Sequence, residues 1–515
     1  MYSTGETYKR AVRADERKVV PYISLGVGFD PTAADDLSTV EYDGLPLSNP
    51  AQIVDANYVM TSGLTTFEDD GIPTAPGSGM IAPPIQPESY PPEAGIWSHD
   101  ISDADGLIDW TVDIKLTQAH TSAFSIYTDT VHILEGRLTY YNGDAVVRDT
   151  TIQTTSDKFQ DTEITTYDRI VFQSIKIDKP YHHIRIVEIE FGASLTLSNT
   201  VLGDTLTLLS EFDPLGISAP VYELDFSLLN VEGEYDQDNP DSLLPQVEKW
   251  LPLTFALTII TDEGQTSIPM GRFYITDRSG TDTLLKVTAQ DARAILQSTF
   301  TPMTLSTEQS LGLMFETMLT DLGIPYVIDD SVYQVMPDNS ITLDDQERDL
   351  LTQALYIQQY YGVYLIPGRD NNLHVTTDDT GDTFPAIDAE GVISYPTPTT
   401  AKTYNYIAVS YKEGQTTKTY TIDLRENETD ARSALQLSNP LVMDATNAER
   451  LARDLQTRIY GQLYDMEAFG DASIDPRDIV PIEGRWTQGN PDSFEITSIE
   501  WKYDGAFLMT LKGVK

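Results

Sequence analysis

The chain has 515 residues, 40% of them hydrophobic, which is enough for several buried cores and argues against wholesale disorder. Its 80 acidic and 33 basic residues give a formal net charge of −47, which disfavours binding to the phosphate backbone of nucleic acid. The absence of cysteine excludes disulfides, thiolate zinc sites and a cysteine nucleophile.

The N-terminal residues 1–30 predict a short basic helix over 5–17 and then a strand in KVVPYISLGVGF. This region lacks the apolar core of a secretory signal. No apolar run of the chain reaches the roughly 18 residues that span a membrane. We therefore expect no export signal and no integral membrane segment.

Residues 31–192 predict an all-β domain that contains an irregular, Pro- and Gly-rich segment over 70–96. From Trp97 onward, alternating segments such as LIDWTVDIKL, AFSIYTD, ILEGRLTYYNG and RIVFQSIKI are bounded by turn residues. Asn142-Gly143 predicts a hairpin. Several short strands at this spacing are typical of a β-sandwich.

Residues 193–300 predict a second strand-rich block, with PVYELDFSLLN, SIPMGRFYITD and TLLKVTAQD as strands. Residues 301–390 predict an α+β block. It has one helix over 306–322, capped near Ser306 and ended by Gly323. A second helix over 344–361 ends at Gly362, and GVYLIPGRDNNLHVTT follows as a hairpin.

Residues 391–515 return to strands such as NYIAVSYKE, KTYTIDLR and FEITSIEWKY. One helix interrupts them over 444–460, and Asp444 is its expected N-cap. The expected buried stripe of this helix comprises Ala448, Leu451, Leu455 and Ile459.

The adjacent His182 and His183 in YHHIRIVEIEFG raise the question of a metal site. Neighbouring residues of a strand face opposite sides, and zinc needs three or four ligands. The remaining histidines, which show no ligand spacing, are His99, His120, His132 and His374. We therefore predict no metal and interpret the stretch as a strand whose alternation slips at Val187, which indicates a bulge.

The loop SHDISDADGLIDW offers carboxylates for calcium, but counting back from Gly106 the EF-hand spacing fails, so we predict an Asp-Gly turn. Trp97, Tyr140 and Tyr141 are the aromatic residues that could stack on a sugar ring, and each could equally belong to the sandwich core. The P-loop, HExxH and GxSxG patterns are absent. We therefore expect no enzyme activity and no cofactor.

Several sequence words of the chain resemble those of tail-tip hub proteins from tailed bacteriophages, especially phages and prophages of Gram-positive gut bacteria. The strand KPYHHIRIVEIEFG resembles the end of a discoidin or galactose-binding-like sandwich. SAPVYELDFSLLN, IPMGRFYITD and LLKVTAQDARAIL resemble a hub barrel with its "A-x-D" word, and Asn439-Pro440 matches an "NP" word of the closing barrel. Asp475-Pro476-Arg477-Asp478 stands where the family has "DPGD", and the arginine there implies that this turn does not need a positive φ.

The resemblance implies a mainly β fold, with two hub-type β-barrels over 193–300 and 391–515, an α+β segment over 301–390 between them, and a galactose-binding-like sandwich inserted over 31–192. It implies a non-enzymatic homotrimer at the virion tail tip, made in the host cytoplasm. Its expected partners are the tail tube, distal tail and tape-measure proteins and a separate tip plug or spike.

In this interpretation the hub caps the tail tube and DNA passes through its lumen without tight binding. The sandwich would brace neighbouring baseplate proteins or bind a host cell-wall glycan. The alternative is an extracellular carbohydrate-binding or carbohydrate-active protein, and a tail fibre is a third class for which the expected elongated repeats are missing.

Overall fold

The protein is described from a computed structural model. The structure describes residues 18–27, 33, 36–42, 45–46, 66–67, 73–74, 96–98, 100–128, 131–154, 158–197, 205–231, 233, 235, 249–261, 264–281, 283–343, 348–377, 381–384, 386–387, 391–399, 404–413, 416–425, 433–459, 462–483, 491–503 and 507–515. The helix expected over 5–17 and most of the Pro-rich segment over 70–96 lie outside the described residues. The chain divides into two compact units, Met1–Ser24 with Thr196–Lys515, and Leu25–Leu195.

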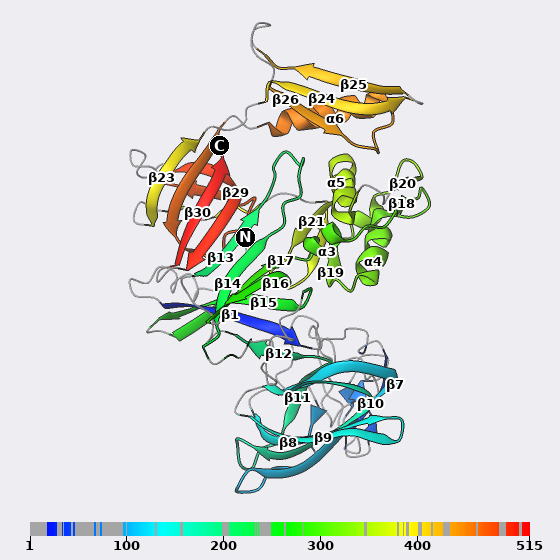
Figure 1. Ribbon diagram of the computed structural model, residues 1–515, viewed down its shortest axis with the longest axis vertical. Helices are drawn as coiled ribbons and strands as arrows, with labels where there is room; N and C mark the ends of the chain where they lie inside the picture. The colour runs from blue at the N-terminus through cyan, green and yellow to red at the C-terminus, as the bar shows by residue number, and fades with distance from the viewer. Residues whose placement is uncertain are drawn as a thin grey trace. The chain divides into compact units, whose positions relative to one another are not determined.

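The larger unit is built on one sheet of twelve strands (Figure 1). In spatial order the strands are β12 (Ala193–Thr196), β1 (Lys18–Val27), β15 (Pro252–Thr261), β16 (Gly264–Thr281), β17 (Leu284–Gln290), β14 (Glu223–Leu229), β13 (Leu206–Glu211), β29 (Asp492–Tyr503), β30 (Phe507–Val514), β27 (Leu463–Phe469) and β23 (Val392–Thr399), with β28 (Ile479–Ile482) paired to β29. The antiparallel pair β13–β29 joins the strands of the second and last sequence blocks.

This sheet confirms the mainly β class but corrects one detail. The two strand-rich blocks were expected to form separate barrels, whereas their strands follow one open path through the described residues. The alternation agrees with the prediction in strands such as β15 and β17, where every second residue is buried. Local alternation shows which face of a strand is buried, but it does not show which distant strand will pair with it.

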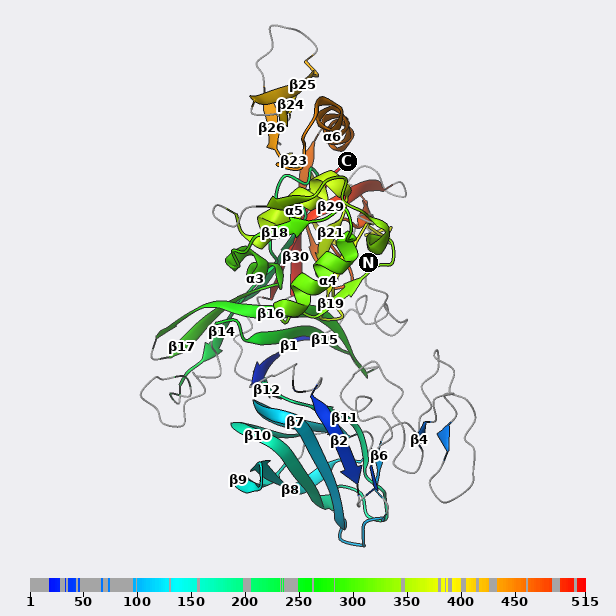
Figure 2. The ribbon, with the colours of Figure 1, turned by 90° about the vertical axis from the view of Figure 1, so that its right-hand side faces the viewer.

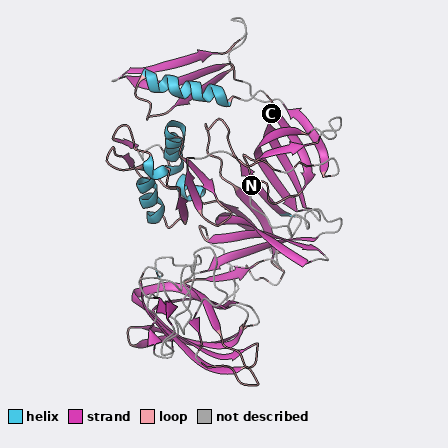
Figure 3. Ribbon diagram, turned by 180° about the vertical axis from the view of Figure 1, so that it is seen from behind, coloured by secondary structure: helices cyan, strands magenta, loops and turns pink. Residues whose placement is uncertain are grey.

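The α+β region lies between these blocks in sequence and contains most of the helices (Figure 3). Its elements are α3 (Arg293–Ser298), β18 (Met303–Leu305), α4 (Leu311–Asp321), β19 (Tyr326–Ile328), the 3-10 helix η4 (Val332–Gln334), β20 (Ile341–Leu343), α5 (Leu350–Tyr361), β21 (Tyr364–Pro367) and β22 (Leu373–Thr376). The strands β21 and β22 form the predicted hairpin.

The helix ends follow local chemistry, but α4 and α5 both begin later than predicted, α5 at Leu350 instead of at residue 344. Helix α5 is capped by Asp349, whose carboxylate accepts the N–H of Thr352, and it ends at Gly362 with φ of 68°. Helix α4 ends before Gly323, as predicted, but its cap is Ser310 rather than Ser306. The extended backbone of Ser310 and its hydroxyl fix the start of α4 one turn later than the sequence indicated.

A separate three-stranded sheet contains β25 (Thr416–Asp423), β24 (Tyr406–Glu413) and β26 (Ala434–Ser438), and α6 (Ala445–Arg458) packs on it (Figure 3). Asp444 caps α6 as predicted, and Ala448, Leu451 and Leu455 lie in its buried stripe. These side chains belong to the same apolar core as the α+β region. Ile459 was expected in the same stripe but is the C-cap residue and is only half-buried.

The smaller unit contains a curled sheet with several long strands (Figure 2), and its buried side chains form one apolar core. The strands of this sheet are β2 (Leu37–Tyr42), β3 (Leu45–Pro46), β6 (Ile96–Trp97), β7 (Leu107–Thr128), β8 (Ile133–Asn142), β9 (Ala145–Gln153), β10 (Lys158–Ile177) and β11 (Arg185–Glu190). Strands β4 (Thr66–Phe67) and β5 (Pro73–Thr74) form a separate two-stranded sheet. Strand β7 merges two predicted strands, and it pairs with β2 along its first half and with β11 along its second half. The two layers expected of a sandwich are therefore joined through β7.

Candidate functional site

The turn Asp475-Pro476-Arg477-Asp478 precedes β28. The N–H of Asp478 donates to the carbonyl of Asp475 over 3.1 Å, and Arg477 has φ of 81°. Proline in the second position and a positive φ in the third define a type II turn. The prediction that this turn does not need a positive φ is therefore wrong, because Arg477 takes a conformation that favours glycine. A bond of 2.6 Å from the N–H of Arg477 to the carbonyl of Ile496 fixes this peptide against β29.

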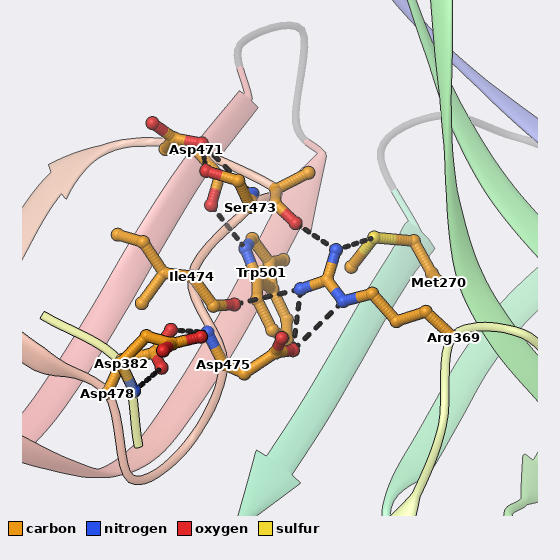
Figure 4. A network of polar contacts seen from close by, with 10 residues as sticks. Met270, Arg369, Asp382, Asp471, Ser473, Ile474, Asp475, Asp478 and Trp501 are labelled. Carbon is orange, nitrogen blue, oxygen red and sulfur yellow. Dashed lines mark hydrogen bonds and ion pairs between the residues drawn. The ribbon is translucent and has the colours of Figure 1, made fainter. Parts of the chain in front are cut away.

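The carboxylate of Asp478 is buried beneath this turn and holds it in place. It accepts the N–H of Asp475 over 2.8 Å and the N–H of Asp382 over 3.0 Å (Figure 4). Burial raises the pKa of the Asp478 carboxyl above its usual range. Gly381 passes so close that a Cβ there would lie 1.9 Å from the carbonyl oxygen of Arg477. The segment around Asp382 and the turn are therefore packed backbone against backbone.

Arg369, in the turn between β21 and β22, reaches the loop that leads into this turn. Its Nε and Nη2 donate to Asp475 Oδ1 over 2.9 and 2.7 Å, and Nη2 also donates to the carbonyl of Ile474 over 2.9 Å (Figure 4). Its Nη1 donates to the carbonyl of Ala472 and lies 3.5 Å from the sulfur of Met270 on β16. The side chain is only 9% exposed. One guanidinium thus joins the α+β region to two parts of the large sheet.

The same loop is held from its other side. The indole Nε1 of Trp501 on β29 donates to the carbonyl of Asp471 over 3.3 Å (Figure 4). The carboxylate of Asp471 accepts the N–H and the hydroxyl of Ser473 over 3.0 and 2.7 Å. The loop therefore meets Arg369 as a preorganised row of carbonyl and carboxylate oxygens.

A second buried pair follows β17. Asp291 and Arg293 form a bidentate ion pair, with Nε–Oδ1 at 3.0 Å and Nη2–Oδ2 at 2.8 Å, and their side chains are 1% and 8% exposed. Asp291 Oδ2 also accepts the N–H of Tyr222 over 2.6 Å, and the guanidinium lies 4.7 Å from the Tyr222 ring centroid. Burial raises the pKa of Tyr222 to about 12. Asp291, the acid of the "A-x-D" word, thus anchors α3 to the segment before β14.

Asn439, the first residue of the "NP" word, joins the small sheet to α5. Its Nδ2 donates to the carbonyl of Tyr356 over 2.9 Å and to Gln359 Oε1 over 3.1 Å, and its Oδ1 accepts the N–H of Leu441 over 2.9 Å. Asn439 is buried. The amide therefore uses both its donor and acceptor sides to fix where the chain leaves β26 for α6.

These contacts form what we call the interior joint, defined by Arg369, Asp291, Asn439, Asp475 and Asp478. An open hollow beside it is lined by residues that include Tyr222, Asp329, His374 and Arg477. The Nη1 atom of Arg477 is buried without a hydrogen-bond partner, and its guanidinium lies 5.5 Å from the Phe212 ring centroid. The carboxylates of the joint accept hydrogen bonds from backbone and guanidinium N–H groups, so their role is to hold neighbouring segments of the chain together.

Two further properties concern the described part of the chain as a whole. No group of three or more His, Asp or Glu residues there could hold a metal ion. No helix there combines the length and apolar character needed to cross a membrane.

The aromatic residues proposed for sugar stacking do not share one surface. Tyr140 is 0% exposed and its hydroxyl donates to Asp161 Oδ2 over 2.8 Å, so a stacking role for this ring is wrong. Burial raises the pKa of Tyr140. Tyr141 is half-buried on the opposite face of β8, with the Arg169 guanidinium 4.8 Å from its ring centroid. Trp97 pairs through its backbone with Arg185, and its side chain lies outside the described residues.

The two histidines lie in the loop before β11 rather than in the strand. His183 Nδ1 donates to the carbonyl of Ser98 over 2.8 Å, and His182 Nδ1 donates to the carbonyl of Pro180 over 2.7 Å. The register shift between Ile186 and Glu188 confirms the bulge predicted at Val187. Both rings therefore support loop geometry.

Sequence reasoning missed Tyr181, which is 66% exposed and has φ of 60°. Its loop is tied to the acidic loop, because Ser102 Oγ donates to the carbonyl of Lys179 over 3.0 Å and Ser102 N donates to the carbonyl of His182 over 3.0 Å. The preceding proline is the signal that could have found it, since proline favours the second position of a turn whose third residue has a positive φ. The acidic loop itself forms the predicted Asp-Gly turn, with Gly106 at φ of 78°.

Comparison with solved structures finds tail proteins. A 43 kDa tail protein of prophage MuSo2 from Shewanella oneidensis matches 61% of this chain and 94% of its own, with 13% identity and a TM-score of 0.42. Prophage tail protein gp18 from Listeria monocytogenes matches 62% of this chain and 91% of its own, with 14% identity and a TM-score of 0.36.

A chitosan-binding module of a Paenibacillus chitosanase/glucanase matches 18% of this chain and 72% of its own, with 13% identity and a TM-score of 0.15. No protein-family model matches the sequence. No curated protein matches it either. At such identities and scores, none of these structural likenesses establishes what this chain does.

Proposed function

We propose that this chain is a structural hub of a phage tail tip, which continues and caps the tail tube and organises the tip proteins as a homotrimer. The observation that carries the proposal is the interior joint. The "A-x-D", "NP" and "DP-x-D" words on which the sequence resemblance rests supply its buried residues Asp291, Asn439 and Asp478 and the partly exposed Asp475. The resemblance therefore lies in residues that hold the unit together, as expected of a scaffold.

The acidity of the chain supports the same proposal. A conduit for DNA must not bind the phosphate backbone, and a net charge of −47 repels phosphates at any surface where the carboxylates gather. An assembled ring with a basic inner wall would contradict this part of the proposal.

Electron microscopy of tailed particles tests the hub directly. A fusion tag on this chain should be found on the tail axis at the tip, with threefold symmetry. The isolated protein should have three times the chain mass of 57.3 kDa by light scattering. A tag found along the fibres, or a protein that stays monomeric at micromolar concentration, would contradict the hub.

For the smaller unit we propose contact with neighbouring baseplate proteins, with a cell-wall glycan as the second candidate. The exposed Tyr181 favours a contact role. A bulky residue with a positive φ destabilises the fold, and a side chain that is 66% exposed gains little compensation from burial. Replacing Tyr181 with Gly should weaken the contact without unfolding the unit. Glycan-array binding that is lost in this variant would select the glycan, whereas unchanged arrays and failed baseplate assembly would select the neighbouring proteins.

A further inference from the structure

The sequence contains a single Asn-Gly dipeptide, Asn142-Gly143, and it lies in an exposed turn. Asn142 is the last residue of β8 and pairs with Ala145, so Gly143 and Asp144 form the two-residue turn. Gly143 has φ of 59°, and no atom lies within 4 Å of where its Cβ would be. Such a turn leaves the N–H of its first residue outside the β-ladder, where water would normally reach it.

In this hairpin the N–H of Gly143 is not left to water. It donates to Asp168 Oδ2 over 2.8 Å. Asp168 belongs to β10, the strand on the other side of β8, and it falls where the register of β10 with β7 shifts between Tyr167 and Arg169. The irregularity in β10 therefore directs a carboxylate from a neighbouring strand onto this one peptide N–H.

That N–H controls a known weakness of Asn-Gly sequences. Asparagine is thermolabile because the backbone nitrogen of the next residue, once it loses its proton, attacks the side-chain Cγ. A bond forms between Gly143 N and Asn142 Cγ, the Cγ–Nδ2 bond breaks, and ammonia leaves. Water then opens the cyclic imide to aspartate or isoaspartate. No oxidant or cofactor enters the balance.

We propose that Asn142-Gly143 is a spontaneous deamidation site that the carboxylate of Asp168 keeps closed. The carboxylate stabilises the protonated N–H by a charge-assisted hydrogen bond, and its negative charge disfavours the anionic nitrogen that must form before attack. The hairpin gains from this protection, because isoaspartate would lengthen the backbone at the residue that sets the register with Ala145.

The test is peptide mapping by mass spectrometry of the full chain, incubated folded at mildly alkaline pH. In Asp168→Ala we expect deamidation of Asn142 about tenfold faster than in the native protein, equal to about 1.4 kcal/mol in the barrier. Asp168→Asn should be intermediate, because its amide oxygen can still accept the bond without the charge. Asp109→Ala, on the same sheet, should match the native rate.

Two internal references separate local protection from unfolding. Asn339-Ser340 should deamidate at one rate in every folded variant, and in urea all variants should deamidate Asn142 equally fast. If Asp168→Ala raises the deamidation rate at Asn339 as well, that variant is partly unfolded, and Asp168→Asn is then used for the test in its place. The proposal is overturned if the variant used for the test deamidates Asn142 at the native rate. A slower rate also overturns it, because it would make Asp168 a promoting base.

Discussion

Backbone strain at Arg477 gives the sharpest test of the interior joint. We compare Arg477→Gly with Arg477→Ala, because both remove the guanidinium near Phe212 and the buried Nη1, so those effects cancel. The left-handed conformation costs alanine about 1–2 kcal/mol, and glycine loses about 0.5–1 kcal/mol of that advantage through its greater freedom when unfolded. Arg477→Gly should therefore be about 0.5–1 kcal/mol more stable than Arg477→Ala.

Urea unfolding followed by tryptophan fluorescence measures this difference through the transition midpoints, with the slope taken as common to both variants. Lys286 on β17 is the matched control, because it is exposed and lacks a positive φ. There the order should reverse, with Lys286→Ala more stable than Lys286→Gly. If Arg477→Ala is at least as stable as Arg477→Gly while the control behaves as stated, the strain at Arg477 is refuted.

Three further predictions concern single contacts. Gly381→Ala should lower the unfolding free energy by about 2–3 kcal/mol, because the new Cβ would lie 1.9 Å from a turn carbonyl oxygen; a loss under about 0.5 kcal/mol in urea would contradict this. Asp291→Ala should lower the unfolding free energy by about 3–5 kcal/mol, because it leaves the Arg293 guanidinium buried and unpaired. The double variant Asp291→Leu with Arg293→Met should recover most of this loss, and a double variant as destabilised as Asp291→Ala would refute the pairing argument. Side-chain hydrogen bonds, the largest contribution coming from Gln118, hold the pKa of Asp36 below its usual range. Its stabilisation is therefore fully present above the pKa of the unfolded chain and is lost as the pH falls through the lower pKa of the folded state. The gap in melting temperature between the native protein and Asp36→Ala should therefore shrink from about pH 6 to about pH 3, and a constant gap would contradict it.

Local features of the fold were readable from the sequence where one short segment decides the outcome. The Gly362 stop of α5 and the Asp444 cap of α6 were predicted because a terminal residue and its own backbone are enough to end or begin a helix. The bulge at Val187 was predicted from the slip in alternation. The cap of α4 was predicted near Ser306 and is Ser310, because the sequence shows which residues offer a hydroxyl but not which of them has the extended backbone of a cap.

The features that escaped prediction depend on distant residues. The left-handed Arg477 is fixed by the bond from its N–H to the carbonyl of Ile496 on β29, and this partner lies outside the turn's own four residues. Tyr140 and Tyr141 follow each other in sequence, and only the pairing of β8 with β10 shows which ring enters the core. The cluster around Arg369 was not predicted for the same reason, because the role of Arg369 depends on a loop about a hundred residues away in the chain.

The order of strands in the large sheet has a consequence for synthesis on the ribosome. Strands β29 and β30 follow every other strand of the sheet in the chain, yet they lie in its interior, between β13 and β27. Until they emerge, β13 and β27 each present an unpaired edge, and exposed edges invite pairing with other chains. A nascent chain therefore exposes these two edges until β29 and β30 have emerged and paired with them. Polysome-bound or truncated forms should depend on chaperones, whereas the folded protein should not.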